Sequence, residues 1–202
     1  MKKKRISSEE RREIIIEAAM KLFSNKGFNG TTTRDIAKES DICEAMLYKH
    51  FNTKESLYTA IIDAGCSHND GHLLPDEDIE DMNVSSVLEF MAANLIKSIS
   101  DNISFMRLFL FSALEGHDLG DIFFKKKIMK HFNSLSVYLK TLMDKGLLKK
   151  QNPKLAARSF IGMIIYYIMV QEIYGGKRIE SFNLDEVVQT FVDIFLNGVK
   201  QG

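Results

Sequence analysis

Residues 28–58 read FNGTTTRDIAKESDICEAMLYKHFNTKESLY, and this stretch decides the fold. Thr32 followed by Asp35 has the form of a helix start, with Thr32 as an N-cap candidate and Asp35 at the third helical position. The helix that begins there is interrupted at Ser40–Cys43 and resumes over Glu44–His50. Two short helices with so short a connection have the spacing of a helix-turn-helix.

The flanking sequence predicts a further helix on each side of this motif. Ser7 and Glu10 form a second capping pair, and Gly27 suits the left-handed position that ends a helix. After the motif, Thr53 begins a helix that is expected to run to about Gly65. The apolar residues that would face inward on these two helices are Ile15, Ala18, Ala19, Leu22 and Phe23, and then Leu57, Tyr58, Ile61 and Ile62.

The rest of the sequence predicts helices only. Residues 67–83 hold six acidic residues and no Lys or Arg, so we place a loop there. Apolar periodicity without strand-like alternation then predicts helices near 84–100, 103–114, 120–145, 153–174 and 183–199. The expected fold is all-α with about nine helices. A three-helix helix-turn-helix domain would occupy residues 1–54, and a second helical domain residues 55–202.

Charge is divided unevenly between these two parts. The formal net charge of the chain is zero, which taken alone argues against a nucleic-acid-binding protein. Residues 1–54, however, carry 12 Lys or Arg and 8 Asp or Glu, whereas the remaining residues carry 15 and 19. A modestly basic end on an acidic body suits a protein of which only one end meets phosphate.

The quoted stretch resembles the DNA-binding signature of the TetR family of transcriptional repressors. The most specific matches are Gly27-Phe28, the Thr31-Thr32-Thr33 run, Asp35-Ile36-Ala37, Leu47-Tyr48-Lys49-His50-Phe51, and Lys54-Glu55 with Leu57. The resemblance implies a homodimer that binds double-stranded operator DNA of pseudo-palindromic sequence, with Glu44–His50 as the recognition helix in the major groove. It also implies a C-terminal domain that binds a small-molecule effector, which would release the repressor from its operator.

The resemblance gives each matched position an expected role. Apolar residues would pack the three short helices together: Ile36, Ala37, Ile42, Leu47 and Phe51. The residues expected to contact DNA are Thr31, Thr32, Thr33, Arg34, Cys43, Glu44, Ala45, Met46, Tyr48, Lys49, His50 and Lys54. Residues at helix starts, together with Tyr48 and His50, would contact phosphates, and Lys49 either phosphate or guanine.

The recognition helix departs from the family pattern at four positions. The family commonly has Ser or Thr at Cys43, a basic residue at Glu44, Gly at Ala45 and a hydroxyl residue at Met46. Glu44 can accept a hydrogen bond from cytosine N4, while Ala45 and Met46 can touch thymine methyl groups. A carboxylate here weakens attraction to the phosphate backbone, and the basic arm Lys2–Arg5 would offset this loss by entering the minor groove. A solvated tail is an equally open interpretation of that arm.

The second half of the chain carries apolar side chains that suit a core, a dimer interface or an effector cavity. The candidates for the cavity are Met91, Phe105, Met106, Phe109, His117, Met163, Tyr166 and Tyr167, which favour a hydrophobic or amphipathic effector. The run Ile161–Val170 has no polar side, so a partner helix is implied. Helices near 153–174 and 183–199 are expected to form the four-helix homodimer interface that the resemblance implies.

Other functional classes find little support in the sequence. We find no Gly-rich phosphate loop, HExxH or GxSxG motif, so neither an enzyme nor a cofactor is expected. Cys66, His68, Asp70 and His72 match no zinc spacing, so no metal site is assigned. Without a secretory signal or a long apolar span, the chain is expected in the cytoplasm, away from membranes. The alternative is a helical small-molecule-binding or partner-binding protein without specific DNA binding, which Glu44 and the zero net charge favour.

Overall fold

The computed structural model describes residues 6–68, 74–75, 83–116, 120 and 124–199. Within these residues the chain forms helices and no β-strand, so the prediction of an all-α fold is confirmed. The chain divides into two compact units, which are treated separately below. One unit joins residues 1–70 to 104–124, and the other joins residues 71–103 to 125–202.

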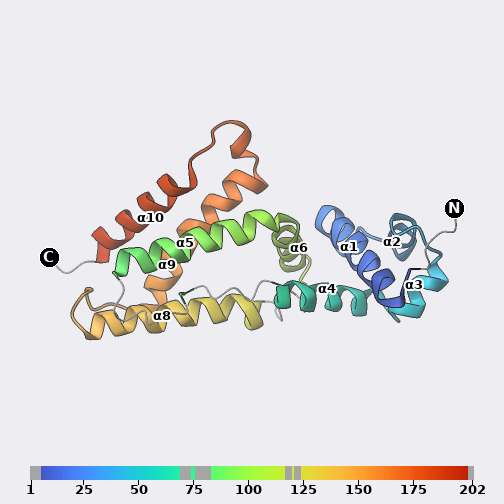
Figure 1. The fold of residues 1–202 in the computed structure, drawn as a ribbon, viewed down its shortest axis with the longest axis horizontal. Coiled ribbons are helices and arrows are strands. Elements are labelled where there is room, and N and C mark those ends of the chain that lie inside the picture. The colour runs from blue at the N-terminus through green and yellow to red at the C-terminus, as the bar shows by residue number, and fades with distance from the viewer. Residues whose placement is uncertain (1–5, 69–73, 76–82, 117–119, 121–123, 200–202) are drawn as a thin grey trace. The chain divides into compact units, whose positions relative to one another are not determined.

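The first unit contains the helix-turn-helix (Figure 1). Its helices are α1 (Ser8–Lys26), α2 (Thr33–Glu39), α3 (Glu44–His50), α4 (Lys54–His68) and most of α6 (Ile103–Leu114). The predicted inward stripes of α1 and α4 are largely buried, with Ile15, Phe23, Leu57 and Tyr58 at most 1% exposed. Burying these side chains supplies most of the stability that such short helices lack on their own.

The predicted capping box at Ser7 and the predicted N-cap at Thr32 are both present and set where the helices begin. The Ser7 hydroxyl accepts from the Glu10 amide, and the Glu10 carboxylate accepts from the Ser7 amide. Thr32 and Asp35 make the same reciprocal pair at the start of α2, and the bond from the Thr32 hydroxyl lowers the pKa of Asp35. These short-range signals explain why the predicted helix starts are correct.

The second unit is a bundle built around α9. Its helices are α5 (Val84–Asp101), α8 (Met129–Asp144), α9 (Pro153–Ile168) and α10 (Leu184–Val199), and α9 packs against the other three. The Phe160 ring of α9 lies 5.0 Å from the Phe195 ring of α10, measured between centroids. The Lys149 amide donates to the Val199 carbonyl at 2.8 Å, which ties the loop after α8 to the end of α10.

Two predicted helices differ from the observed ones because π-helical turns interrupt them. The segment predicted over 120–145 contains the π-helical turn Phe124–Ile128 before α8, and the segment predicted over 153–174 ends in another, Met169–Ile173. A short 3₁₀ turn, Gly176–Arg178, follows. Apolar periodicity does not distinguish an α-helical turn from a π-helical one, so the sequence did not reveal these changes.

The segment Pro153–Ile173 is long and apolar enough to cross a membrane by length and composition, although no other described helix is. The core helix of a soluble protein can have the same length and composition. One side of this segment is buried in the bundle, whereas Leu155 and Tyr166 on it are more than half exposed. Within the run Ile161–Val170, Gly162 and Tyr166 are exposed and the other residues are buried or half-buried.

Candidate nucleic-acid interface

A buried scaffold holds α2 and α3 against α1. Ile36 and Ala37 of α2, Leu47 of α3 and Phe51 beyond it are all at most 5% exposed, as predicted. Ile42 in the turn is half-buried. Because the scaffold is fixed from inside, the opposite face of α3 is free to carry residues chosen for contact rather than for packing.

The turn between α2 and α3 is closed by hydrogen bonds from both sides. The Ser40 hydroxyl donates to the Ile36 carbonyl at 2.8 Å, and the Ile42 amide donates to the Ala37 carbonyl at 3.0 Å. Asp41 between them has a positive φ of 52°, the left-handed region that side-chain-bearing residues seldom enter. Cys43 then begins α3 without a side-chain capping bond.

A chain of hydroxyl groups joins the two helices across the outer surface. The Tyr48 hydroxyl donates to Thr33 Oγ1 at 3.4 Å, and the Thr33 hydroxyl donates to Glu44 Oε1 at 3.1 Å. Thr33 is the first residue of α2, and Glu44 is the first residue of α3. The side chains at the two helix starts are thus connected directly.

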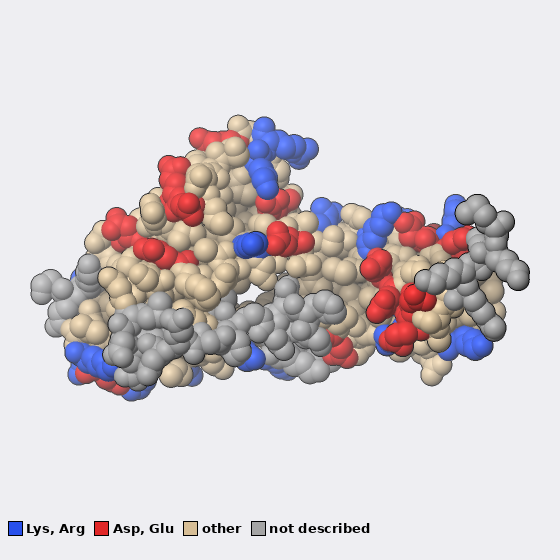
Figure 2. Space-filling view, in the orientation of Figure 1, with Lys and Arg blue, Asp and Glu red and all other residues tan. Residues whose placement is uncertain are grey.

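The outward face of the motif carries most of the predicted DNA contacts. Cys43, Ala45, Tyr48 and Lys49 are exposed, with Tyr48 at 47%, and Glu44, Met46 and His50 are half-buried. On α2 and just before it, Arg34 and Thr32 are exposed and Thr33 is half-buried. Figure 2 shows acidic and basic side chains interspersed over the visible face of this region.

Two predicted contacts have structural partners of their own. Thr31 is 1% exposed and its hydroxyl donates to the Gly27 carbonyl at 2.9 Å, so its side chain fixes the loop after α1. Lys54 Nζ lies 4.0 Å from the centroid of the Phe28 ring, in a cation–π contact. Partial burial lowers the pKa of Lys54, against the opposing effect of the Glu55 and Glu115 carboxylates.

The packing of α6 on this motif was not predicted from the sequence. Glu115, just after α6, accepts from the backbone amides of Phe28 at 3.0 Å and Asn29 at 3.3 Å. Arg107 Nε donates to the Ser24 carbonyl at 2.9 Å, at the end of α1. Long-range acceptors for loop amides leave no short-range signal in the sequence.

An aromatic cluster supports the same junction from within. The rings of Phe23, Phe28 and Tyr58 have centroids 5.1 to 5.6 Å apart, in stacked and edge-on pairs. The Tyr58 hydroxyl donates to the Leu108 carbonyl of α6 at 3.2 Å, and burial raises the pKa of Tyr58 to about 12. The α1–α2 loop, α4 and α6 therefore share one buried centre.

Comparison with known proteins identifies the family. Residues 15–61 match the model of the bacterial regulatory proteins of the tetR family, and residues 83–198 match the C-terminal domain of AefR-like transcriptional repressors. The chain belongs to the TetR family. It is a DNA-binding transcriptional regulator of the helix-turn-helix type, in agreement with the resemblance seen in residues 28–58.

Individual relatives agree with this TetR-family assignment. The chain is 26% identical to the transcriptional regulator YvkB of Bacillus subtilis over 190 residues, which cover 92% of this chain and 95% of YvkB. It is 32% identical over 77 residues to IcaR, the negative regulator of the biofilm operon in Staphylococcus aureus, covering 38% of this chain and 41% of IcaR. The fold matches that of AibR, solved with isovaleryl coenzyme A and operator DNA, with a TM-score of 0.69, 20% identity, and coverage of 92% and 97%.

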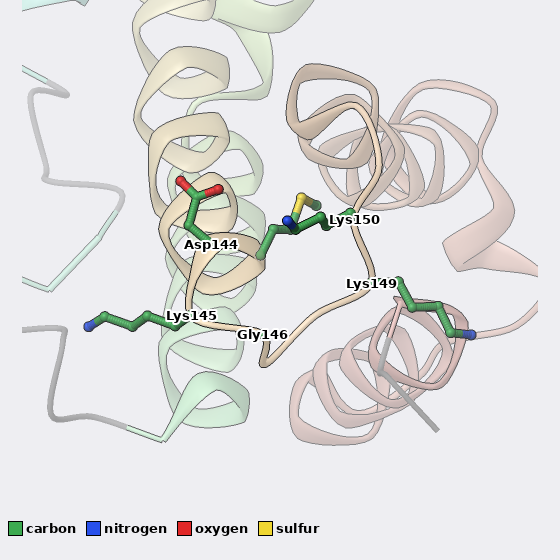
Figure 3. A pocket seen from close by; sticks show the side chains of 6 residues that line it. Asp144, Lys145, Gly146, Lys149 and Lys150 are labelled. Atoms are coloured by element: carbon green, nitrogen blue, oxygen red, sulfur yellow. The ribbon is translucent and has the colours of Figure 1, made fainter.

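Neither the cavity beside the start of α5 nor the one at the end of α8 is lined by a predicted effector residue. Met91 is fully buried, Phe105, Met106, Phe109, Met163 and Tyr167 are half-buried, and Tyr166 is 67% exposed. One cavity of about 510 Å³ lies beside the start of α5 and includes Ser85, Glu89 and Asp193. The other, of about 540 Å³, lies at the end of α8, where Figure 3 shows Lys145 and Lys149 extending in opposite directions. Cations that diverge in this way do not form a single binding site.

Several predicted features lie outside the described residues or side chains. These are the basic arm Lys2–Arg5, His117, and the group Cys66, His68, Asp70 and His72. Among the side chains that the structure does describe, no group of three or more His, Cys, Asp and Glu is placed to hold a metal ion. The role of the basic arm in the minor groove therefore stays a prediction, and no metal site is assigned to the group Cys66, His68, Asp70 and His72.

Proposed function

We propose that this TetR-family protein is a repressor that binds a pseudo-palindromic operator as a homodimer and is released by a small hydrophobic or amphipathic effector. The observation that carries the proposal is the outward face of α3, whose exposed side chains stand on a fully buried scaffold. Support comes from the AefR-like repressor domain and from IcaR, which is a negative regulator.

We assign the residues of this face by their chemistry. Arg34, Lys49 and Lys54 supply positive charge to phosphates, with Thr32, Tyr48 and His50 as polar neighbours. Cys43, Glu44, Ala45 and Met46, at the start of the recognition helix, face base edges. Thr31 contributes indirectly, because its buried hydroxyl donates to the Gly27 carbonyl and so holds the loop after α1.

The dimer is supported by the apolar surface of α9 and α10. Leu155 and Tyr166 of α9 and Ile194 of α10 are each at least 57% exposed in the single chain. Large exposed apolar residues on neighbouring helices are typical of an interface between copies, since water disfavours such a surface. A two-fold dimer would set the two recognition helices about 34 to 36 Å apart, one turn of DNA.

Release by an effector requires a preference between two conformations. The effector must bind the conformation that cannot span the operator about 10⁴-fold better to move the equilibrium from 1:99 to 99:1. AibR, which was solved with isovaleryl coenzyme A, supports an organic effector for this chain too. The predicted effector residues remain parts of this proposal, except Tyr166, whose 67% exposure suits the dimer surface better. A cytoplasmic, non-enzymatic role is also part of it.

Selection of bound fragments from random duplex DNA tests the proposal. The full chain should enrich an inverted repeat whose half-sites are centred one helical turn apart, because a two-fold dimer reads both halves alike. Lys49→Ala and Tyr48→Ala should weaken binding to all duplexes, and Lys49→Ala should also reduce the salt dependence. Failure to enrich any site would refute a sequence-specific repressor.

A second candidate is a helical partner-binding protein that no longer reads DNA. It is favoured by the Glu44 carboxylate on the DNA-facing surface, where phosphate would be repelled. Binding to duplex DNA that weakens steeply with added salt would exclude this candidate.

A further inference from the structure

Thr33 and Glu44 form a polar contact between the start of α2 and the start of α3, the expected recognition helix. The Thr33 hydroxyl donates to Glu44 Oε1 at 3.1 Å, and both side chains are half-buried. The Tyr48 hydroxyl approaches the same Thr33 oxygen at 3.4 Å. Glu44 is therefore held from α2, although it belongs to α3.

The number of protons in the hydrogen-bonded series Tyr48, Thr33 and Glu44 limits which further hydrogen bonds each group can make. A hydroxyl has one proton, and a carboxylate has none. While Thr33 donates to Glu44, it has no proton for a phosphate, which only accepts. Glu44 keeps its second oxygen, Oε2, for a donor that arrives with DNA. Among base edges in the major groove, the amino group at cytosine N4 is the donor that acidic side chains pair with.

We propose that Thr33 is a positioning residue for base readout, which holds the Glu44 carboxylate in place to accept from the N4 amino group of a cytosine. The inference rests on the proposed operator binding. A free glutamate loses side-chain freedom when it meets a base, and the bond from Thr33 removes part of that freedom beforehand. Thr33 then sets the base preference without touching the base.

Neighbouring threonines show why this role falls to Thr33. The Thr32 hydroxyl is engaged with Asp35 in the capping box, and the Thr31 hydroxyl is buried on the Gly27 carbonyl. Of the three hydroxyl groups in the run, the one at Thr33 bonds to a residue of the recognition helix.

The test compares Thr33→Val, which keeps the shape and removes the hydroxyl, with Thr33→Ser, which keeps the hydroxyl. Selection from random duplexes by the full chain should give a cytosine preference at one position of each half-site for the natural protein and for Thr33→Ser. Thr33→Val should reduce that preference by roughly 3- to 10-fold, the usual effect of one hydrogen bond. Binding to duplex without a site, and its salt dependence, should change less than about 2-fold.

A double-mutant cycle with Glu44→Ala separates positioning from direct contact. Glu44→Ala should abolish the cytosine preference, and adding Thr33→Val should then change nothing further, because the two residues act through one contact. Thr33→Ala, which removes the hydroxyl in a smaller side chain, should repeat the Thr33→Val result if the valine variant folds poorly. Thermal unfolding checks each variant before use.

Three results would overturn the inference. One is an unchanged cytosine preference in both Thr33→Val and Thr33→Ala. Another is a uniform loss of affinity for all duplexes with the preference intact, which would make Thr33 a phosphate contact. The third is a change in base preference on Thr33→Val that is equally large in the natural protein and in Glu44→Ala. In each case the natural protein still enriches an inverted repeat, whereas failure of the proposed function would remove that enrichment from the natural protein itself.

Discussion

Asp41 occupies the one left-handed backbone position found for a residue other than glycine in the described chain, with φ at 52°. Asp41 lies in the turn of the helix-turn-helix, so its strained backbone conformation helps to set the angle between α2 and α3. Asp and Asn tolerate this region better than other residues with a side chain, and glycine enters it freely.

Replacing Asp41 tests this strain. Asp41→Gly should raise the free energy of unfolding by about 0.5 to 1 kcal/mol, and Asp41→Val should lower it by about 1 to 2 kcal/mol, in urea denaturation. Asp41→Asn is the matched control and should lie within about 0.5 kcal/mol of the natural protein. A valine variant as stable as the natural protein would show that the turn is not strained.

Tyr58 predicts a loss of stability in alkali. Burial raises its pKa from 10 to about 12, so the folded state favours the protonated phenol. The resulting stabilisation is fully present below pH 10 and is lost as the pH rises from 10 to 12, by about 2 to 3 kcal/mol. Tyr58→Phe has no proton to lose there, so its unfolding free energy should fall less over this range. Tyr174→Phe, at an exposed position, controls for the loss of one tyrosine, and equal slopes for Tyr58→Phe and the natural protein would contradict the burial argument.

At this scale the sequence predicted residue types better than residue partners. The caps at Ser7 and Thr32 were predictable because their partners lie three residues away. The sequence did not reveal which threonine of the run faces inward, because the burial of Thr31 depends on how the loop after α1 packs. The bond from Thr33 to Glu44 depends on the crossing of α2 and α3, which no pattern within either helix specifies.

At the scale of elements, α6 belongs with the DNA-binding helices. Glu115 supplies acceptors to two amides of the α1–α2 loop, and a carboxylate bond to a backbone amide is stronger than a neutral one. Gly27 makes this approach possible, since a Cβ there would lie 2.4 Å from Glu115 Oε1. Its φ of 74° also favours glycine.

Removing the carboxylate should loosen this contact. Glu115→Ala should lower the free energy of unfolding by about 1 to 3 kcal/mol, because the part-buried Phe28 amide and the exposed Asn29 amide lose their acceptor. Glu115→Gln keeps one acceptor oxygen and should lose about half as much. Glu180→Ala, at an exposed position, is the control and should have little effect. Hydrogen exchange at the Phe28 and Asn29 amides should quicken in Glu115→Ala, and unchanged exchange would contradict the role given to Glu115.

Helix positions were predictable and helix partners were not. Apolar periodicity located α5, α6, α8, α9 and α10 to within a few residues, apart from the two π-helical turns. The docking of α6 on the α1–α2 loop joins residues 86 or 87 positions apart through backbone amides. Such bonds involve the identity of only one side chain, so they leave almost no trace in sequence.

At the scale of the whole molecule, the exposed apolar surface of α9 and α10 bears on assembly. Tyr166 is 67% exposed, which suits a face between copies better than the wall of an effector cavity. A dimer of this kind would bury the apolar side of Ile161–Val170 that the single chain leaves partly uncovered.

A charge placed on this surface should separate the copies. Ile194→Asp, on α10, should convert a dimer to a monomer in sedimentation velocity, because an unpaired carboxylate would be buried at the interface. Val137→Asp is the matched control, since Val137 on α8 is 66% exposed and Ile194 is 57% exposed, and it should remain dimeric. The same oligomeric state for both variants would contradict the assignment of the interface to α9 and α10.

The discontinuous make-up of the first unit has a practical consequence for building chimeric regulators. A graft that takes only residues 1–54, or even 1–68, from this chain leaves behind Arg107, the Leu108 carbonyl and Glu115, which complete the loop and the aromatic centre. The recipient would have to provide equivalent groups on its own sixth helix. The transferable module is therefore two separate segments of sequence, and a functional hybrid requires a second junction on each side of α6.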